Sequence, residues 1–233
     1  MENLDLSIVL PAYNESENLP DVLNNLKKVL ARAKIRAEII VVDNGSTDGT
    51  GVVLESLKKE IKELKTLRIG KNIGWGNGII KGLEIARGPI LGFSVADGQI
   101  TPESIINIYL KLKSGNFDLC KGVRVERQDG LVRLMISKIY NSIFRLILQF
   151  PYKDINGVPK IFTRNFYKVV KLQSRDSFID PEIFIKARLN NFSVGEVPII
   201  SLDRKRGRST VSVLTMLAFL KGLFCWLLFK KFI

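Results

Sequence analysis

The sequence predicts an α/β fold in which helices flank both faces of a mostly parallel sheet. Short runs of β-branched and other apolar residues alternate with longer segments of helical periodicity, an order typical of parallel strands joined by crossover helices. The strand runs are apolar at nearly every position, as in sheets buried on both faces. A chain of 233 residues, 46% of them hydrophobic, fits one such domain with at most a small appendage.

The expected elements follow one another along the chain. Strands are expected at residues 6–10, 37–42, 67–69, 89–94 and 118–122, where short apolar runs meet turn-forming residues. Helices are expected at residues 18–32, 49–61 and 79–86 and from Thr101 onward. The last of these has an N-cap threonine, a first-turn proline and an early acid in Thr101-Pro102-Glu103.

Two later segments are strongly apolar. Residues 131–150 predict an amphipathic helix with a wide apolar arc and a basic stripe. Residues 211–229 contain a single charged residue, Lys221, which with Gly222 interrupts the segment near its middle. The interruption favours a helix lying in a membrane interface over a helix that spans the bilayer. Packing into the protein core is the alternative for both segments.

The composition narrows the possible chemistry. A net charge of +13 indicates an acidic partner, such as anionic lipid headgroups or a phosphorylated substrate. Nucleic acid is not expected, because no aromatic platform or recognition motif accompanies the charge. The sequence has no histidine, which excludes Ser-His and Cys-His nucleophiles and histidine-ligated zinc. Cys120 and Cys225 form no disulfide framework and the acidic N-terminus is no signal peptide, so a cytosolic environment is expected.

Unusual polar residues follow three of the expected strands. They are Pro11-Ala12-Tyr13-Asn14-Glu15, the run from Asp43 to Thr50, and Asp97-Gly98-Gln99. Ligands bind beyond the carboxyl ends of strands in open α/β sheets. Tyr13 is therefore placed to stack on a base, and Asp43 is placed to accept hydrogen bonds from a base or ribose. Asp97 is placed to face a cation that bridges a diphosphate. Each motif alone also fits a turn, and Asp48 also fits a helix cap.

Longer motifs surround these positions. They are Ser7-Ile-Val-Leu-Pro-Ala-Tyr-Asn-Glu15, Val42-Asp-Asn-Gly-Ser-Thr-Asp-Gly-Thr50, Asn72-Ile-Gly-Trp-Gly76 and Ala96-Asp-Gly-Gln99. Together they resemble the inverting family 2 glycosyltransferases with a GT-A (Rossmann-like) fold. Later motifs are similar to the dolichyl-phosphate mannose/glucose synthase-like branch: Arg124, Asp154-Ile-Asn-Gly-Val-Pro-Lys160, Asp180-Pro-Glu182, Gly195-Glu-Val-Pro198 and Arg204 with Gly207-Arg208-Ser209.

The resemblance implies a role for each matching residue. The donor-binding residues would be Pro11, Ala12, Tyr13, Glu15, Asp43 and Asp97. Mg²⁺ or Mn²⁺ would be held by Asp97 and Gln99, and the acceptor phosphate would be contacted by Arg124, Arg133, Lys160 and Arg204. The sugar and acceptor side would be lined by Asp154, Asn156 and Glu182. The catalytic set would be Asp97, Arg124, Glu182 and Arg204.

Val95 departs from the family pattern. The family usually has Asp-X-Asp where this chain has Val95-Ala96-Asp97, so the first carboxylate is missing. A single carboxylate with the donor diphosphate would hold a divalent ion weakly. Alternatively the arginines would neutralise the leaving diphosphate, or the chain would bind the donor without turnover.

The resemblance also implies the activity. The expected reaction is inverting transfer of a hexosyl group from a GDP-mannose or UDP-glucose type donor to a polyprenyl phosphate at the cytoplasmic face of the cell membrane. Residues 1–210 would form the catalytic domain and residues 211–233 a membrane-associated helix. One alternative is a glycan or other glycolipid acceptor, which needs Glu182 as a base, although an acid there also suits a helix first turn. The other is a non-catalytic nucleotide-sugar-binding subunit.

Overall fold

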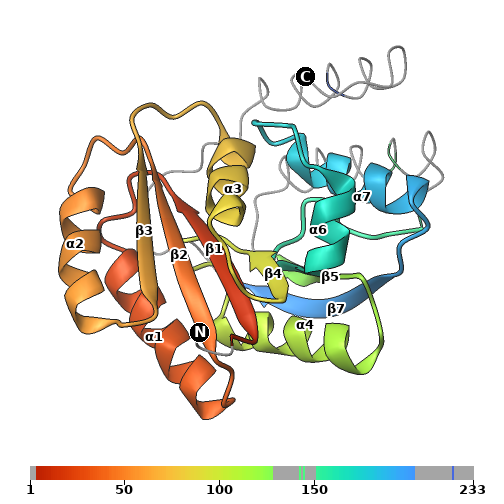
Figure 1. The fold of residues 1–233 in the computed structure, drawn as a ribbon, viewed down its shortest axis with the longest axis horizontal. Coiled ribbons are helices and arrows are strands. Elements are labelled where there is room, and N and C mark those ends of the chain that lie inside the picture. The colour runs from red at the N-terminus through yellow and green to blue at the C-terminus, as the bar shows by residue number, and fades with distance from the viewer. Residues whose placement is uncertain (1–3, 128–141, 143, 145–150, 203–221, 223–233) are drawn as a thin grey trace.

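The computed structural model describes residues 4–127, 142, 144, 151–202 and 222 of the chain. Its strands form one sheet: β1 (Leu6–Ala12), β2 (Ala37–Asn44), β3 (Leu64–Ile69), β4 (Ile90–Phe93), β5 (Leu119–Arg127), β6 (Lys160–Thr163) and β7 (Val194–Ser201). In space they follow the order β3-β2-β1-β4-β6-β5-β7 (Figure 1). Among these strands β6 runs antiparallel to both neighbours, and the other pairings are parallel.

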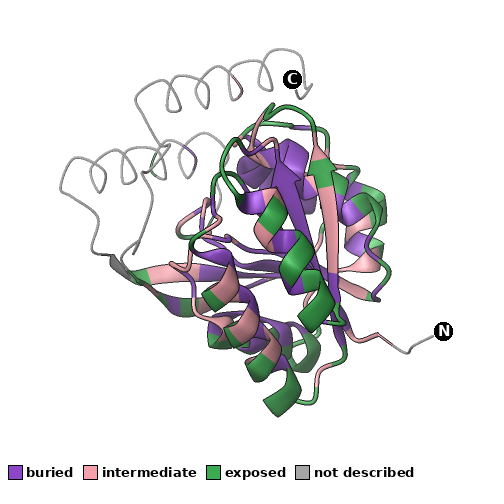
Figure 2. Cartoon of the chain, turned by 90° about the vertical axis from the view of Figure 1, so that its left-hand side faces the viewer, coloured by how far each residue is buried: buried purple, intermediate pink, exposed green. Residues whose placement is uncertain are grey.

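Helices cover the sheet. They are α1 (Leu19–Arg32), α2 (Thr50–Glu60), α3 (Trp75–Glu84), α4 (Pro102–Ser114), α6 (Arg164–Val170) and α7 (Ile179–Leu189). Helix α1 contacts α2 and α4, whereas α3 packs against β1, β2 and β4 (Figure 1). Every residue of β1 and β2 is buried, as the continuous purple of the central strands shows (Figure 2). The expected mostly parallel sheet flanked by helices is therefore confirmed.

The expected elements of the first half are all present, with shifted ends. Helix α3 begins at Trp75 instead of residue 79, and its Gly76 and Gly78 allow neighbouring segments to pack closely against the helix. A Cβ on Gly76 would lie 2.2 Å from the Ser174 carbonyl oxygen, and one on Gly78 would lie 3.0 Å from the Pro11 Cβ. Strand β5 extends to Arg127 because it continues to pair with β7.

The second half contains elements that were not expected from the sequence. Strands β6 and β7 and helix α6 are among them, and so is the reversal of direction at β6. Strand β6 has only four residues and begins with a lysine, so its pattern carries little strand signal.

Several expectations lie outside the described residues. These are the helix at residues 131–150 apart from positions 142 and 144, the helix at 211–233 apart from position 222, and the side chains of Arg133 and Arg204. Within the part of the chain that the structure describes, no helix combines the length and apolar character needed to cross a membrane.

Candidate functional site

Side-chain hydrogen bonds join the loops that follow β1 and β2. The Asn14 side-chain oxygen accepts from the Thr47 amide at 2.9 Å, and the Asn14 amide donates to Ser46 Oγ at 3.0 Å. Further along, the Glu15 amide donates to Thr50 Oγ1 at 2.9 Å. Asn14 adopts a φ of 57°, a left-handed conformation that asparagine tolerates. The first two motifs therefore form one continuous surface at the carboxyl edge of the sheet.

Asp43 is the penultimate residue of β2 and lies at this surface, in register with Ala12 of β1. Its side chain is buried, and Oδ1 accepts from the Ser46 amide at 2.9 Å. Oδ2 lies 3.7 Å from Arg68 Nε, an ion-pair distance, and has no hydrogen-bond partner among the described residues. An open cavity of about 700 Å³ between α2 and β3 reaches Asp43. A buried carboxylate oxygen beside a cavity is suited to accept an N–H or O–H from a ligand.

The other expected donor-binding residues differ in exposure. Tyr13 is 39% exposed, so its ring is accessible beside the joined loops. Pro11, Ala12 and Glu15 are buried. Pro11 packs against α3, where it meets Gly78. The placement suits Tyr13 for direct contact with a ligand and the other three for shaping the loop.

Asp97 lies in the loop after β4, and this loop is tied to the end of β7. Asp97 Oδ1 accepts from the Gln99 amide at 3.0 Å, across a turn in which Gly98 has a φ of 75°. The Gln99 carbonyl accepts from the Leu202 amide at 2.9 Å, and Gln99 Nε2 donates to the Leu202 carbonyl at 3.3 Å. Since β7 pairs with β5, the Asp97 loop lies beside the carboxyl ends of β5 and β7.

A row of four residues crosses the adjoining strands. Phe93 pairs with Lys160, Lys160 with Lys121, and Lys121 with Glu196. In-register neighbours point to the same face of a sheet. Both lysine side chains are fully buried, and their ammonium nitrogens lie 5.5 and 5.7 Å from the ring centroid of Phe184 in α7. Two buried lysine side chains therefore lie between the sheet and α7.

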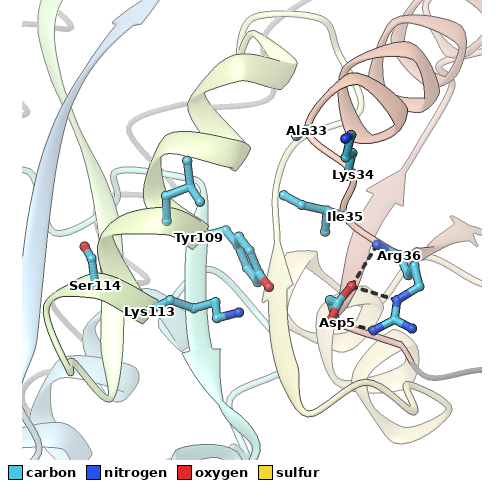
Figure 3. Close-up of a pocket in the computed structure, with 9 residues that line it drawn as sticks. Asp5, Ala33, Lys34, Ile35, Arg36, Tyr109, Lys113 and Ser114 are labelled. Carbon is cyan, nitrogen blue, oxygen red and sulfur yellow. Dashed lines mark hydrogen bonds and ion pairs between the residues drawn. The ribbon is translucent and has the colours of Figure 1, made fainter.

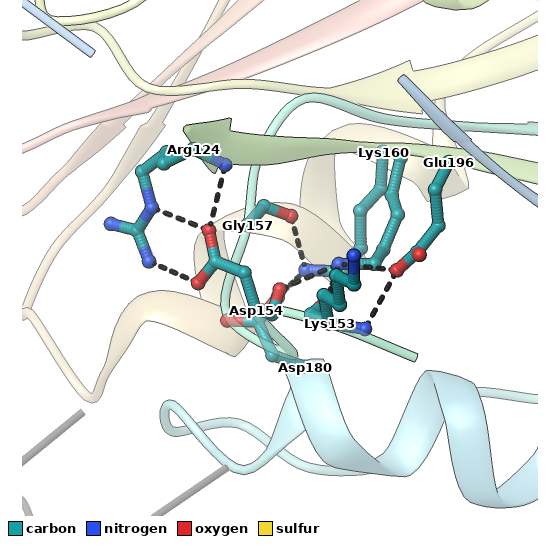
Figure 4. A network of polar contacts seen from close by, with 8 residues as sticks. Arg124, Lys153, Asp154, Gly157, Lys160, Asp180 and Glu196 are labelled. Carbon is teal, nitrogen blue, oxygen red and sulfur yellow. Dashed lines mark hydrogen bonds and ion pairs between the residues drawn. The ribbon is translucent and has the colours of Figure 1, made fainter. Parts of the chain in front are cut away.

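Arg124 of β5 is held by Asp154 through a two-point contact (Figure 4). Arg124 Nε donates to Oδ2 at 2.8 Å and Nη2 donates to Oδ1 at 2.6 Å. The Arg124 amide also donates to Oδ2, at 3.1 Å. The side chains are 15% and 9% exposed, so the guanidinium is fixed in a mostly buried position.

Burial and charge act in opposite directions on the ionisable groups of this region. Burial raises the pKa of Asp154, but the hydrogen bonds and charge of Arg124 outweigh it and lower the pKa to about 2. Burial lowers the pKa of Lys121 to about 8, although Asp154 and Glu196 favour its charged form. At neutral pH Asp154 is therefore ionised, and Lys121 is mostly protonated.

Lys160 was expected to contact the acceptor phosphate, and the structure places its side chain inside the protein. Its ammonium group donates to the Gly157 carbonyl at 2.9 Å and is paired with Asp180. Burial lowers the pKa of Lys160, and Asp180 acts against that shift. With no exposed surface and both contacts inside the protein, the group links the 153–157 segment to α7.

Glu182 is placed in the same way, although a catalytic role was expected. Its side chain is fully buried. Oε1 accepts from the Gln173 amide at 2.9 Å and from Lys186 Nζ at 2.6 Å, and Oε2 accepts from the Ser174 amide at 2.8 Å. The carboxylate thus anchors the segment before α7, and this geometry does not supply a base at the surface.

The arrangement of carboxylates near Asp97 fits a metal ion that binds together with the diphosphate. Within residues 4–127 and 151–202 no group of three or more acidic or cysteine side chains is arranged to hold an ion. Asp97 supplies a single carboxylate beside Val95, and the Gln99 side chain bonds to Leu202. One carboxylate suits a cation that arrives with a diphosphate and keeps waters as further ligands. It does not suit a metal site that forms before the donor binds.

Another open groove lies at the opposite edge of the sheet. The exposed ion pair of Asp5 and Arg36 lines this groove, together with Tyr109 and Lys113 (Figure 3). Asp5 and Arg36 precede β1 and β2, so the groove is at the amino ends of these strands. It is therefore separate from the edge that carries the motifs.

The structure adds two residues that the sequence did not single out. Lys121 belongs to the polar network, and Lys153 contributes its backbone. Glu196, which lies in the Gly195-Glu-Val-Pro198 motif but was given no role, joins them. The available signal was a lysine at 121 directly after the apolar pair Leu119-Cys120 in a predicted strand. A charged side chain within a buried strand requires a partner.

The chain matches a known family over most of its length. Residues 7–178 match the model described as Glycosyl transferase family 2. Two relatives, from Shewanella sediminis and Pseudomonas fluorescens, are each named undecaprenyl-phosphate 4-deoxy-4-formamido-L-arabinose transferase and are each 26% identical to this chain. The similarity covers 93% and 91% of this chain but 65% and 62% of the relatives, so the chain spans less than two thirds of their length.

Solved structures share the fold. The crystal structure of glucosyl-3-phosphoglycerate synthase from Mycobacterium tuberculosis with Mn²⁺, UDP and phosphoglyceric acid has a TM-score of 0.74 and 17% identity, covering 97% of this chain and 78% of that one. The complex of the same enzyme with phosphoglyceric acid has a TM-score of 0.75 at 17% identity, covering 97% and 79%. These likenesses concern the fold, and the match over residues 7–178 shows that the chain belongs to glycosyl transferase family 2.

Proposed function

We propose that the protein is an inverting glycosyltransferase that moves a sugar from a nucleotide diphosphate donor to a polyprenyl phosphate. The observation that carries the proposal is the placement of Asp43, Asp97 and Arg124 at one edge of the sheet. The carboxylates of Asp43 and Asp97 are suited to bind the nucleotide donor. The Arg124 guanidinium, which Asp154 holds in place, is suited to bind the acceptor phosphate. The names of the two relatives support a lipid phosphate as acceptor.

On the donor side, Tyr13 and Asp43 bind the nucleoside and Asp97 faces the diphosphate. The Tyr13 ring is exposed and suits stacking on a base. Asp43 Oδ2 is buried and accepts a base or ribose hydrogen. Mg²⁺ or Mn²⁺, when bound with the diphosphate, neutralises charge on the leaving group.

On the acceptor side, Arg124 orients the phosphate, with Arg133 and Arg204 proposed to assist from outside the described residues. An acceptor phosphate oxygen attacks the anomeric carbon as the bond to the donor diphosphate breaks, which inverts the configuration. The phosphate is already anionic at neutral pH, so no proton has to be removed by a base. The protein contributes alignment and charge stabilisation.

The acceptor decides between this reaction and a related one. A glycan acceptor has a hydroxyl to deprotonate and needs a general base. Glu182, the expected candidate for that base, is fully buried and bonded through both oxygens, which favours the phosphate acceptor. Val95 motivates a further candidate, a subunit that binds donor without transfer.

We further propose that transfer takes place at the cytoplasmic face of the membrane. Residues 1–210 would form the catalytic domain and residues 211–233 a membrane-associated helix, in line with the apolar sequence and the net charge of +13. The transferred group is a hexosyl group from a GDP-mannose or UDP-glucose type donor. The pentose derivative named for the two relatives is the competing sugar.

A transfer assay tests the proposal. The protein is incubated with undecaprenyl phosphate in detergent micelles and with labelled GDP-mannose, UDP-glucose or nucleotide-activated 4-deoxy-4-formamido-L-arabinose, with and without Mg²⁺ or Mn²⁺. We expect label in the solvent-extractable lipid for one donor, and we expect Asp97→Ala to abolish it. Lys65→Met, at the other end of the sheet, is the control. Donor binding without any transfer would favour the non-catalytic subunit, and transfer only to glycans would exclude the lipid phosphate.

A further inference from the structure

Two buried ammonium groups hold the segment from Lys153 to Gly157. Lys121 Nζ donates to the Asp154 carbonyl at 2.6 Å and also to the Lys153 carbonyl. Lys160 Nζ donates to the Gly157 carbonyl at 2.9 Å. Three backbone carbonyls of one short segment are therefore bonded to cations that come from neighbouring strands.

The segment is also fixed by its own conformation and by β7. Asp154 has a φ of 44°, and its carbonyl accepts from the Gly157 amide at 2.7 Å. The Lys153 amide donates to Glu196 Oε1 at 2.9 Å, and the same oxygen lies 3.5 Å from Lys121 Nζ. Lys121 and Glu196 thus contact the same end of the segment, as Figure 4 shows for Glu196 and Lys153.

This segment presents Asp154 to Arg124. Both carboxylate oxygens of Asp154 are used in that contact, so the position of the segment sets the position of the guanidinium. Lys121 lies three residues before Arg124 on β5, and its side chain is linked to Arg124 through the segment and Asp154. In this region Lys121, Lys160 and Arg124 pair with Glu196, Asp180 and Asp154, respectively.

We propose that Lys121 is a positioning residue that fixes the 153–157 segment and, through Asp154, the orientation of Arg124 toward the acceptor phosphate. The inference rests on the proposed function for the identity of that phosphate, whereas the link from Lys121 to Arg124 rests on the contacts alone. Without the ammonium group, the carbonyls of Lys153 and Asp154 lose a buried donor. The segment then has freedom to shift, and Arg124 shifts with it.

The link is tested by NMR on full-length protein with ¹⁵N-labelled arginine. The Arg124 Nε–H signal is assigned by its loss in Arg124→Lys, and its exchange with water is measured in Lys121→Met. We expect exchange about tenfold faster than in the wild type, because buried carbonyls left without a donor shift local equilibria by about an order of magnitude. Lys65→Met is the matched control, since Lys65 also pairs with a buried acid, at 2.6 Å, but far from this segment.

A milder variant keeps the test valid if Lys121→Met does not fold. Glu196→Ala removes a partner of Lys121 that is 27% exposed, so the fold tolerates the change better. We expect the Arg124 Nε–H to exchange faster than in the wild type, but with a smaller increase than in Lys121→Met. Exchange within about twofold of the wild type in the folded variants overturns the proposal, since a lost buried partner gives larger changes.

The transfer assay adds a readout that a general loss of stability does not produce. We expect Lys121→Met to raise the KM for undecaprenyl phosphate about tenfold, while the Kd for the donor nucleoside diphosphate changes less than about twofold. An equal increase in the KM for undecaprenyl phosphate and in the Kd for the donor nucleoside diphosphate overturns the positioning role. If the wild-type protein transfers no sugar, the proposed function fails, and the NMR exchange rate alone decides whether Lys121 positions Arg124.

Discussion

Asp154→Asn tests the pairing at the centre of the polar network. The substitution keeps the size of the side chain and removes its charge. The asparagine carbonyl oxygen can accept a hydrogen bond from one nitrogen of Arg124. The asparagine NH₂ group then faces the second guanidinium nitrogen, and because both groups are donors they form no hydrogen bond. The Arg124 side chain is only 15% exposed, so water cannot fully replace the lost partner. We expect a less stable protein at neutral pH.

The pKa of Asp154 sets the size of the effect. It is lowered from an ordinary 3.8 to about 2, a difference that corresponds to about 2 kcal/mol of stability. Breaking a fully buried ion pair costs about 3–5 kcal/mol. Because Arg124 keeps some contact with water, we expect the free energy of unfolding to fall by about 2–3 kcal/mol at pH 7.

The pH dependence follows from the same shift. A carboxyl group with a lowered pKa in the folded state binds fewer protons there than in the unfolded chain, so its stabilisation is complete above its ordinary pKa. It is lost as the pH falls from 3.8 through about 2. Urea unfolding followed by circular dichroism should therefore show a difference between wild type and variant that is constant above about pH 5 and disappears near pH 2.

Asp5→Asn is the matched control. Asp5 also binds an arginine at two points, with Arg36 Nε at 3.1 Å and Nη2 at 3.2 Å, but the side chains are 27% and 61% exposed. Exposed ion pairs contribute little, so its loss should be several-fold smaller than that of Asp154→Asn. Equal losses in the two variants, or a loss for Asp154→Asn that persists at pH 2, would refute the reasoning.

Four further variants test other parts of the site. Asp97→Ala should abolish transfer while leaving the circular dichroism spectrum unchanged; near-normal turnover would remove Asp97 from the mechanism. Asp43→Asn should weaken binding of the donor nucleoside diphosphate about tenfold by calorimetry, because a charged acceptor is lost. Gly76→Ala should destabilise the protein by about 1–3 kcal/mol in urea, since its Cβ would lie 2.2 Å from the Ser174 carbonyl oxygen. Glu182→Gln should lower the Tm and keep kcat within about twofold; loss of kcat in a stable variant would restore a role as base.

The regular half of the fold was predictable because its signals are local. Residues 37–42 are apolar except for Glu38, a pattern typical of a buried strand, and Thr101-Pro102-Glu103 marks a helix start that the structure places at Pro102. Strand β6 gives no such signal. Its lysine is stabilised by Asp180 and by the Phe93 and Phe184 rings, which are distant in sequence. Strand direction at β6 likewise depends on tertiary packing.

The site was predictable in its parts but not in its contacts. The strand ends placed Asp43 and Asp97 at one edge from residue order alone. The sequence does not distinguish an exposed polar residue from a buried one, so it does not reveal that Lys160 and Glu182 lie inside the protein. Their partners, Asp180 and Lys186, become evident only once the chain is folded.

The hydrogen bonds between the loops after β1 and β2 have a consequence for the energetics of donor binding. Asn14 and Thr47 are bonded to each other by side-chain contacts in the protein alone, so this part of the proposed nucleoside-binding surface exists before a ligand arrives. Binding then loses little conformational entropy in these loops, because they are ordered in advance. Asn14→Ala should accordingly make donor binding entropically less favourable, even though the side chain is bonded to protein and not to the donor.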